Sequence, residues 1–349
     1  MGKLLKEYDP GDQVDSVCVL GSLSVRQTKA QKPFLRLELN DSSGRIDAVM
    51  WDGFDEEMTR TPPGVVLQVQ GRLEEYNDKA QVVVNRITIP PPGSFDPSDL
   101  MPSSERDNNK MIAELDKLVS GVNNPLIRKL LETAFGDEPF RTAFSQAPAA
   151  KRWHQPYIGG LLEHTLNVVS HARALAARYP EVEPDIVLAG ALLHDIGKTV
   201  EYTWDGYLDN STQGKLVGHL VIGVEMLGGW IAQVGKFPEQ LGWHIKHIIL
   251  SHHGRLEYGS PLPPRTLEAL VVHFADDLDS KMGGVMKVRN QQLDSPGEWT
   301  DYIRLMETEF FKAPVLETSP AAEGKPSSPA AKPNKSGRDN DSGENQSLF

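Results

Sequence analysis

The sequence contains a single cysteine, Cys18, and no long apolar run. One cysteine cannot form an internal disulfide, so we expect a reducing compartment, the cytoplasm. Cys18 lies in the apolar segment VCVL, which predicts a buried small side chain rather than a nucleophile. No stretch approaches the apolar length that crosses a bilayer, and the first residues show neither the apolar core nor the cleavage site of a secretion signal. We therefore expect no membrane partner.

Acidic residues outnumber Lys and Arg, so positive charge is in the minority and the formal net charge is −12. Broad, non-specific coating of nucleic acid needs many cations that pair with phosphates, so this balance argues against it. The balance remains compatible with a local basic groove and with carboxylates gathered around bound cations. The apolar share of 39% and the charged share of 24% are typical of an ordinary globular protein.

Histidine is missing from the first 153 residues, and all 10 histidines lie between His154 and His273. Histidines with scattered structural roles would fall in both halves of the chain. The clustering predicts a histidine-rich site in one domain.

Residues from about 12 to 90 show the two-residue period of half-buried strands. In PFLRLELND, Leu35, Leu37 and Leu39 alternate with Arg36 and Glu38. The segments RIDAVMW, VVLQVQGRL and QVVVNRITI continue the pattern, and turn-forming residues separate them. With the apolar run around Cys18, about five short strands are expected, which suggests a small closed barrel.

The consecutive prolines that begin at Pro90 cannot continue a sheet and predict a stiff linker. Apolar residues at three- and four-residue spacing then predict helices from Asn109 to about Phe144 and from about 157 to 312. From about Pro320 the chain has almost no large apolar residues, so we expect disorder. The predicted units are a barrel over 1–92, a linker with a helical extension over 93–150, a helical domain over 151–315 and a disordered tail over 316–349.

Four residues in apolar helical segments carry the chemistry of metal binding: His164 in GGLLEHT, His194 and Asp195 in LLHDIGK, and Asp276 in HFADDLD. Imidazole nitrogens and carboxylate oxygens together suit divalent ions. Burying a His–Asp pair costs roughly several kcal/mol unless something compensates it, and a metal ion does so directly. Taken singly, His164 reads better as a hydrogen-bonded core residue and Asp276 as a helix cap. The four together favour a metal site.

This H…HD…D pattern, with HDIGK intact, resembles the HD-domain metal-dependent phosphohydrolases over roughly residues 150 to 285. The resemblance implies an all-α core with one or two divalent ions, manganese being favoured over Mg²⁺, Fe²⁺, Co²⁺ or Zn²⁺. His164, His194, Asp195 and Asp276 match the first metal site. His219, His252 and His253 look like the extra histidines of two-metal members, with Asp195 bridging. The alternatives for His253 are a substrate contact and a solvated position before Gly254.

The resemblance also implies that a metal-activated water attacks phosphorus, with Asp195 and Lys198 as catalytic residues. Lys198 would hold a phosphate, or it is a cation at a helix C-terminus after Gly197. We expect His154 to contact substrate and His273 to be a partner of a metal ligand. For His171, His244 and His247 we expect ordinary structural or surface roles.

The N-terminal segment FLRLELNDSSGRIDAVMWD resembles the OB-fold nucleic-acid-binding module. By strand parity, Phe34 shares the outward face with Arg36, and Trp51 shares it with Arg45, which suits base stacking and phosphate contact. Lys32 lies in the preceding loop. Residues 1–95 carry 11 Lys and Arg against 14 Asp and Glu, so any basic groove is local. The alternative is that Phe34 or Trp51 belongs to the barrel core.

An OB-type module ahead of GGLLEHT, LLHDIGK, GHL, LSHHG and HFADDLDSKM is similar to the YhaM-type 3′→5′ exoribonuclease family. The fold class expected is a small all-β OB-type barrel followed by an all-α HD-type helical domain and a disordered tail. One departure is Trp153, which replaces the first residue of a His-His pair common in that family. The implied function is metal-dependent 3′→5′ hydrolysis of single-stranded RNA, with DNA as a second substrate. The alternatives are an HD-type nucleotide or cyclic-nucleotide phosphodiesterase and a non-catalytic nucleic-acid-binding adaptor.

Two further partners stay open. The last residues, NQSLF, resemble short motifs that dock on bacterial sliding clamps, although a terminus without function is the favoured interpretation. A homo-oligomer is neither indicated nor excluded by the sequence.

Overall fold

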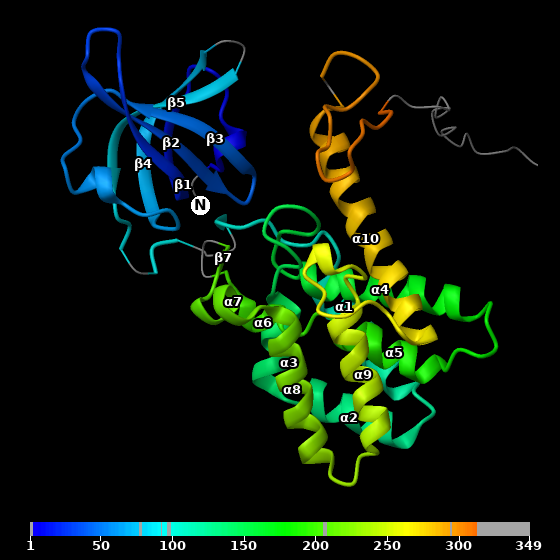
Figure 1. The fold of residues 1–349 in the computed structure, drawn as a ribbon. Helices are drawn as coiled ribbons and strands as arrows, with labels where there is room; N and C mark the ends of the chain where they lie inside the picture. Colours follow the sequence, from blue (N-terminus) through cyan, green and yellow to red (C-terminus); the bar gives the residue numbers. More distant parts are fainter. Residues whose placement is uncertain are drawn as a thin grey trace, which may run out of the picture.

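The computed structural model describes residues 3–76, 79–91, 93–95, 99–204, 208–293 and 295–312. Figure 1 shows five N-terminal strands gathered in a barrel and the following helices gathered in a second body. This is the predicted order of an all-β module followed by an all-α domain. The predicted disordered tail, including NQSLF, lies outside the described residues.

The barrel closes through strands in the order β1-β2-β3-β5-β4, with β4 returning to β1. All neighbouring strands are antiparallel except β3 and β5, which pair in parallel. Closure gives each of the five strands two hydrogen-bonded neighbours. The strands are β1 (Gln13–Gln27), β2 (Pro33–Asp41), β3 (Gly44–Met50), β4 (Val66–Tyr76) and β5 (Lys79–Thr88).

The barrel core follows the predicted alternation. Leu35, Leu37 and Leu39 of β2 point inward and are buried, while Arg36 points outward. Cys18 is fully buried, and burial raises the pKa of its thiol to about 12, which confirms the prediction of an inert small side chain. A short 3₁₀ helix, η1 (Leu5–Glu7), packs against the barrel, where the backbone N–H of Leu5 donates to the buried carboxylate of Asp41.

The segment between the barrel and the helices is pinned at two points. The N–H of Ser42, at the β2–β3 turn, donates to the carbonyl of Asp99, and the N–H of Ser104 donates to the carbonyl of Ile158. The first contact ties the linker to the barrel and the second ties it to the helical body.

Polar side chains cap the starts of three helices. Asp107, Asn124 and Asp137 accept hydrogen bonds from the first turns of α1, α2 and α3, and proline follows two of these caps directly or one residue later. The helices are α1 (Asn108–Ser120), α2 (Pro125–Phe135), α3 (Glu138–Gln146), α4 (Gly160–Ala176), α5 (Pro184–Leu193), α6 (Lys198–Glu201), α7 (Thr212–Val217), α8 (His219–Val234), α9 (Glu239–Ser251) and α10 (Leu267–Gln291), with 3₁₀ turns η2 (Met58–Arg60) and η4 (Leu256–Tyr258).

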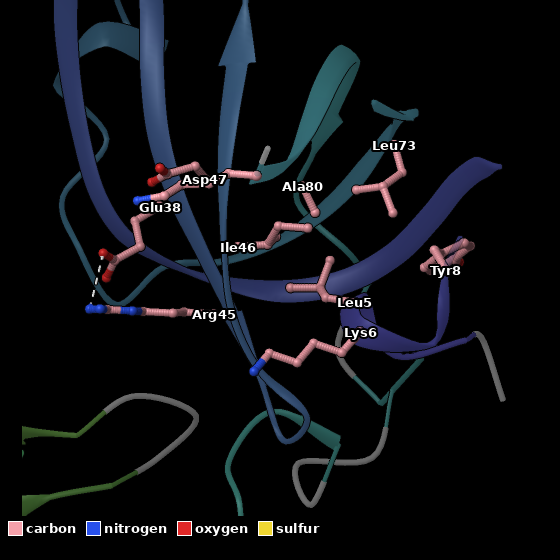
Figure 2. Close-up of a pocket in the computed structure, with 10 residues that line it drawn as sticks. Leu5, Lys6, Tyr8, Glu38, Arg45, Ile46, Asp47, Leu73 and Ala80 are labelled. Carbon is pink, nitrogen blue, oxygen red and sulfur yellow. Dashed lines mark ion pairs between the residues drawn. The ribbon is translucent and has the colours of Figure 1, made fainter. Parts of the chain in front are cut away.

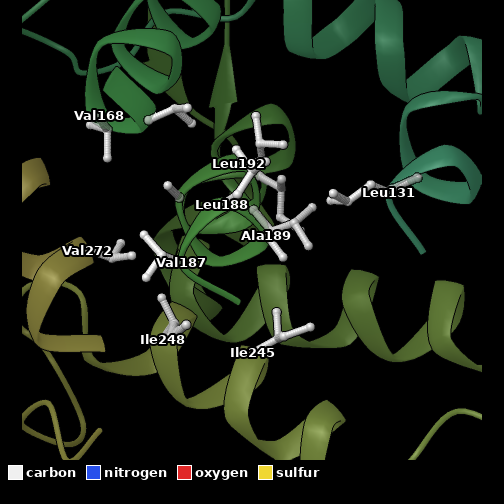
Figure 3. Packing of buried hydrophobic residues seen from close by; sticks show 14 of the residues in the cluster. Leu131, Val168, Val187, Leu188, Ala189, Leu192, Ile245, Ile248 and Val272 are labelled. Carbon is white, nitrogen blue, oxygen red and sulfur yellow. The ribbon is translucent and has the colours of Figure 1, made fainter. Parts of the chain in front are cut away.

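Helix α5 is the centre of the helical core. Figure 3 shows its side chains meeting Val168 of α4, Leu131 of α2, Ile245 and Ile248 of α9, and Val272 of α10. Gly190 lets α9 approach closely, since a Cβ at this position would lie 2.6 Å from Cδ1 of Ile248. Because α5 ends at the middle of the bundle, the residues that follow it, His194 and Asp195, are held inside the core.

The prediction of helix up to residue 312 is wrong after α10. Residues 295–312 instead form a loop with antiparallel bridges between Trp299 and Phe311 and between Ile303 and Thr308. Pro296 and Gly297 explain the change, because this pair ends a helix and favours a turn. Two short strands that were not predicted, β6 (Tyr202–Thr203) and β7 (Asp209–Asn210), form a small hairpin. No described helix is both long enough and apolar enough to span a membrane.

Candidate metal centre

Four predicted residues from three helical segments converge on one point. His164 comes from the middle of α4, His194 caps α5, Asp195 follows it, and Asp276 lies on α10. Nε2 of His164 lies 3.2 Å from Nε2 of His194 and 3.1 Å from Oδ1 of Asp276. It lies 3.6 Å from Oδ2 of Asp195. The donor atoms of all four lie within 4.8 Å of one another, a geometry in which one ion can reach each of them.

Three more histidines form a second group beside the first. Nε2 of His219, the first residue of α8, lies 3.3 Å from Nε2 of His253, and His252 completes the set. Oδ1 of Asp195 lies 3.6 Å from Nε2 of His219 and 3.5 Å from Nε2 of His252. The two oxygens of Asp195 therefore face different groups, which is the arrangement of a bridging carboxylate.

Each of the five histidines offers Nε2 to the centre and has its other ring nitrogen occupied. A carbonyl acceptor fixes the proton on Nδ1 and leaves the Nε2 lone pair free for a cation. The Nδ1 contacts are His194 to Ala191 O at 2.8 Å, His252 to Ile249 O at 2.8 Å, His253 to Tyr258 O at 3.0 Å, His164 to Asp279 Oδ2 at 2.7 Å, and His219 to Glu201 Oε2 at 3.0 Å.

Asp195 is a buried carboxylate at the centre of the site. It is buried, and neither carboxylate oxygen has a hydrogen bond of regular geometry, although Nζ of Lys198 lies 2.6 Å from Oδ2. Burial would raise the pKa of Asp195, but Lys198 and His194 hold it well below its usual range. A buried, ionised carboxylate with open lone pairs is suited to a divalent cation.

The alternative interpretation of Lys198, a cation at a helix C-terminus after Gly197, is wrong. Lys198 is the first residue of α6 and is buried beside Asp195. Burial lowers the pKa of an ammonium group, but Asp195 raises that of Lys198 further, and the group stays charged. The ammonium group of Lys198 therefore already forms an ion pair with Asp195.

Protonation of the histidines differs within the centre. Burial lowers the pKa of His164, but hydrogen bonds to Asp276 and Asp279 raise it to about 9. Burial, with His252 and His219 as neighbours, lowers the pKa of His253 to about 3. His253 is therefore neutral and ready to bind a cation, whereas His164 must first lose a proton.

The segment Trp153–Gln155 forms one wall of the centre. The ring of His154 lies 4.9 Å from that of His164, and both of its nitrogens are buried without a hydrogen-bond partner. Trp153 lies directly over Gly284 of α10, where a Cβ would come within 2.0 Å of its indole. Gln155 takes an unusual φ of 36° and donates from Nε2 to Oδ2 of Asp279 at 3.1 Å. This strained turn thus reaches the carboxylate that holds His164.

The remaining histidines lie outside the two groups. His273 was expected to be a partner of a metal ligand, and its Nδ1 lies 2.7 Å from the backbone carbonyl of His252, a member of the second group. His247 and His244 have contacts of their own with the backbone N–H of Arg265 and the carboxylate of Glu268. Nε2 of His171 lies 3.8 Å from Oδ1 of Asp279.

Sequence reasoning missed Asp279, Glu201 and Gln155, which hold the histidines in place. Asp279 had a signal, because it lies three residues after Asp276 on the same face of a helix. Glu201 and Gln155 had none, since their contacts join segments 18 and 124 residues apart.

The barrel presents the predicted aromatic and basic residues on its outer face. Phe34 and Trp51 pair with ring centroids 4.7 Å apart, and Trp51 is 50% exposed. Neither belongs to the barrel core, so that alternative is wrong. Arg36 lies 3.4 Å from Asp47, and Arg45 lies 3.8 Å from Glu38. Lys32 is exposed in the loop before β2.

Two hollows lie along this face. Figure 2 shows the larger one between η1 and strands β2, β3 and β5, with Lys6 and Arg45 near its rim and Leu5 and Ile46 in its floor. Lys79 is a further lining residue. The smaller hollow is lined by Ser22, Ser24, Arg26 and Arg36. Both carry carboxylates as well as cations, so the positive charge is local, as the net charge requires.

Comparisons with known proteins cover both parts of the chain. Residues 161–281 match the HD domain family, and residues 17–90 match an OB-fold nucleic acid binding domain. The chain is 30% identical over 325 residues to the 3′-5′ exoribonuclease YhaM of Geobacillus sp. (strain WCH70), covering 91% of this chain and 97% of that protein. It is 30% identical over 317 residues to YhaM of Bacillus subtilis (strain 168), covering 90% and 99%. Among solved structures, the second OB-fold domain of replication protein A from Methanococcus maripaludis aligns with 28% of this chain at 17% identity and a TM-score of 0.22.

Proposed function

This chain belongs to the YhaM family of 3′-5′ exoribonucleases, and we propose that it removes nucleotides from the 3′ end of single-stranded RNA by metal-dependent hydrolysis. The observation that carries the proposal is the convergence of four imidazole Nε2 atoms on Asp195, with one of its oxygens facing His164 and His194 and the other facing His219 and His252. An adaptor that only binds RNA has no need for such a centre, and a small-nucleotide phosphodiesterase has no need for the barrel. Single-stranded DNA is a second candidate substrate.

For the metal centre, the proposed ligands of one ion are His164, His194, Asp195 and Asp276. A second ion would be held by His219, His252 and His253, with Asp195 shared between the two. Manganese is the favoured ion, and the nitrogen and oxygen donors also suit Fe²⁺, Co²⁺ and Zn²⁺.

Divalent ions bound there would activate a water molecule and neutralise phosphoryl oxygens. The protein's own residues hold the geometry: Asp279 and Glu201 orient His164 and His219, and Lys198 keeps Asp195 ionised. The proposed phosphate contact is His154, because both of its ring nitrogens lack partners and the ring lies beside His164. Lys198 would reach a phosphate only by leaving Asp195.

On the barrel, the proposed strand-binding face centres on the Phe34–Trp51 pair, which would stack on bases. Arg36, Arg45 and Lys32 would contact phosphates, which requires Arg36 and Arg45 to give up exposed ion pairs worth only about 0–1 kcal/mol each. With this role, the proposed division is a nucleic-acid-binding unit over 1–92, a linker and helical extension over 93–150, a hydrolase unit over 151–315 and a tail over 316–349.

The test is a single-stranded RNA oligomer labelled at its 5′ end, given to the purified protein with and without manganese. Stepwise shortening from the 3′ end is expected.

Asp276→Asn should abolish shortening. Asp277→Asn, the same change one residue further on, should preserve it, because Asp277 pairs only with Lys281 on the described surface. Hydrolysis of cyclic dinucleotides but not of RNA would favour the phosphodiesterase alternative, and no metal-dependent product from either would refute the enzyme.

The sliding-clamp proposal for NQSLF concerns residues outside those described. A pull-down with purified clamp, using the full chain and a chain without its last five residues, tests it. Equal capture of both forms would remove the proposal.

A further inference from the structure

One face of α10 carries a row of large apolar side chains that nothing in the described chain covers. The six residues are each between 44% and 55% exposed and follow one another at three- or four-residue spacing. Along a helix that rises 1.5 Å per residue, the row is about 28 Å long. We call this row the α10 ridge: Leu267, Leu270, Phe274, Leu278, Met282 and Met286.

The opposite face of the same helix is buried against other helices. Val272, Ala275 and Asp279 are buried where α10 packs on α4, α5 and α9. Figure 1 shows the C-terminal part of α10 rising beyond these helices. Helix α10 therefore has two apolar faces. One is buried within the described helical body, and the other is the exposed ridge.

The area of the ridge is more than half of what one partner buries in a standard interface. Six half-exposed Leu, Phe and Met side chains present on the order of 500 Å² of apolar surface, whereas a standard interface buries about 800 Å² on each partner. The segment after α10 adds exposed apolar side chains at the end of the helix, namely Leu293, Trp299, Tyr302 and Leu305. The ridge alone therefore supplies more than half of the area that one partner buries in a standard interface.

The four-residue spacing of the ridge is one that suits packing against a second copy of the same helix. Side chains four residues apart form an inclined row, and two such rows pack side by side when helices cross at about −50°. A two-fold axis needs one patch that is complementary to itself, and two-fold dimers are the commonest oligomers. The chain's own end is a poor occupant, because residues 313–349 contain only Val315, Leu316, Leu348 and Phe349 as large apolar residues, in two separate pairs.

We propose that a second copy of this chain packs its α10 ridge against this one and forms a two-fold dimer. Phe274 and Leu278 are each two residues from Asp276, so the ridge and the metal centre lie on different faces of one helix. The partner would therefore clamp the helix that carries Asp276 and Asp279 without entering the centre.

The first test is the mass of the full-length protein by sedimentation velocity at micromolar concentration. The expected wild-type mass is twice 38.6 kDa. Leu278→Glu combined with Met282→Glu should give 38.6 kDa, since charges on the ridge would be buried without partners. The matched control is Leu216→Glu on α7, a position that is 81% exposed and should leave the dimer intact. Circular dichroism and bound-metal content of each variant verify folding. A monomeric wild type, or an oligomer that the ridge variant leaves unchanged, overturns the proposal.

The second test locates the contact by crosslinking. Cys18 is buried, and burial raises the pKa of its thiol to about 12, so it should not react with maleimides. Phe274→Cys, Leu278→Cys and Met282→Cys, treated singly with a bismaleimide, should give covalent dimers on a denaturing gel, and Leu216→Cys should not. A wild-type dimer that none of the three ridge cysteines crosslinks would place the interface elsewhere and refute the ridge.

Discussion

Asp195 is the residue on which both halves of the proposed metal centre depend, because each of its oxygens faces a different histidine group. Asp195→Asn should therefore reduce metal content at both sites and lower the rate of RNA hydrolysis by about 10³-fold or more, which corresponds to losing several kcal/mol of metal stabilisation. Metal content by mass spectrometry and hydrolysis of labelled RNA measure the two effects. Two ions per chain in the variant would contradict the shared role.

Removal of this charge also bears on stability. Lys198 is buried beside Asp195, and taking away one member of a buried ion pair costs about 3–5 kcal/mol. The double variant Asp195→Asn with Lys198→Met should recover part of that loss in urea unfolding without recovering hydrolysis, which separates folding from chemistry.

His164 makes metal binding dependent on pH. Its pKa is raised to about 9 in the folded, metal-free protein, against 6.5 for a free histidine. The bound proton stabilises the metal-free fold fully below about pH 6.5, and this stabilisation is lost as the pH rises through about 9. Metal must displace that proton, so the affinity for Mn²⁺ should rise by about tenfold per pH unit between pH 6.5 and 9 and then level off. Titration calorimetry measures it, and an affinity constant across that range would disprove the effect.

At the residue scale, the sequence predicted donors better than the groups that orient them. The four candidate ligands are recognisable in the sequence because they are polar residues in apolar helical segments: His164, His194, Asp195 and Asp276. Gln155 does not, because its contact with Asp279 depends on a turn with φ of 36° that no local pattern encodes. The role of His253 was open in the sequence, and the structure places its Nε2 beside that of His219.

At the scale of elements, the contact between the Trp153 turn and α10 is the one we expect to be most sensitive. Gly284→Ala would place a methyl group 2.0 Å from the Trp153 indole. Displacing the indole should cost about 1–3 kcal/mol of stability and, by moving Gln155 away from Asp279, weaken metal binding about 10- to 100-fold. Urea unfolding and a metal titration measure the two losses.

Gly229→Ala in α8 is the matched control. Apart from the neighbouring residues and backbone of its own helix, no described atom lies within 4 Å of the added Cβ. The exchange should leave metal binding unchanged and raise stability by about 0.5–1 kcal/mol, because alanine is the better helix former. If Gly284→Ala behaved like this control, the turn would have no positioning role.

Elements with a clear period were predictable and those that depend on single breakers were not. The alternation of Leu35, Leu37 and Leu39 gave β2 correctly, because one face of a barrel strand is always buried. The expected helix over 295–312 failed because Pro296 and Gly297 outweigh the apolar spacing around them. The β6–β7 hairpin is two residues deep and too short to show any period.

For the whole molecule, the proposed division of labour separates strand binding from hydrolysis. Trp51→Ala should raise KM for a long single-stranded RNA by about 10- to 100-fold, since stacking contributes about 1–3 kcal/mol per base, and should leave the hydrolysis of a dinucleotide unchanged. Tyr76→Ala, at another exposed aromatic position of the barrel, is the control. Equal losses on long and short substrates would contradict a separate strand-binding role.

The sequence described the whole molecule well in its order of parts and poorly in its surface. An amphipathic helix shows one apolar face in the sequence, and that face is assigned to the core. Only the packing of α10 reveals that Val272 and Ala275 fill the core while Phe274 and Leu278 stay outside. A helix with two apolar faces cannot be recognised from the spacing of its apolar residues, because the residues of the two faces alternate and no single period stands out.

The five histidine rings of the centre are fixed at Nδ1 before any ion arrives. Such a cage accepts an ion without rotating a ring, so it offers little means of rejecting one divalent metal in favour of another. Intrinsic affinity then follows the general series, in which Mn²⁺ binds most weakly and Zn²⁺ far more tightly. We therefore expect that the supply of metals decides which ion the protein carries, and that any preference for manganese reflects this supply. Protein purified from zinc-rich and manganese-rich cultures should then carry different ions in the same unaltered site.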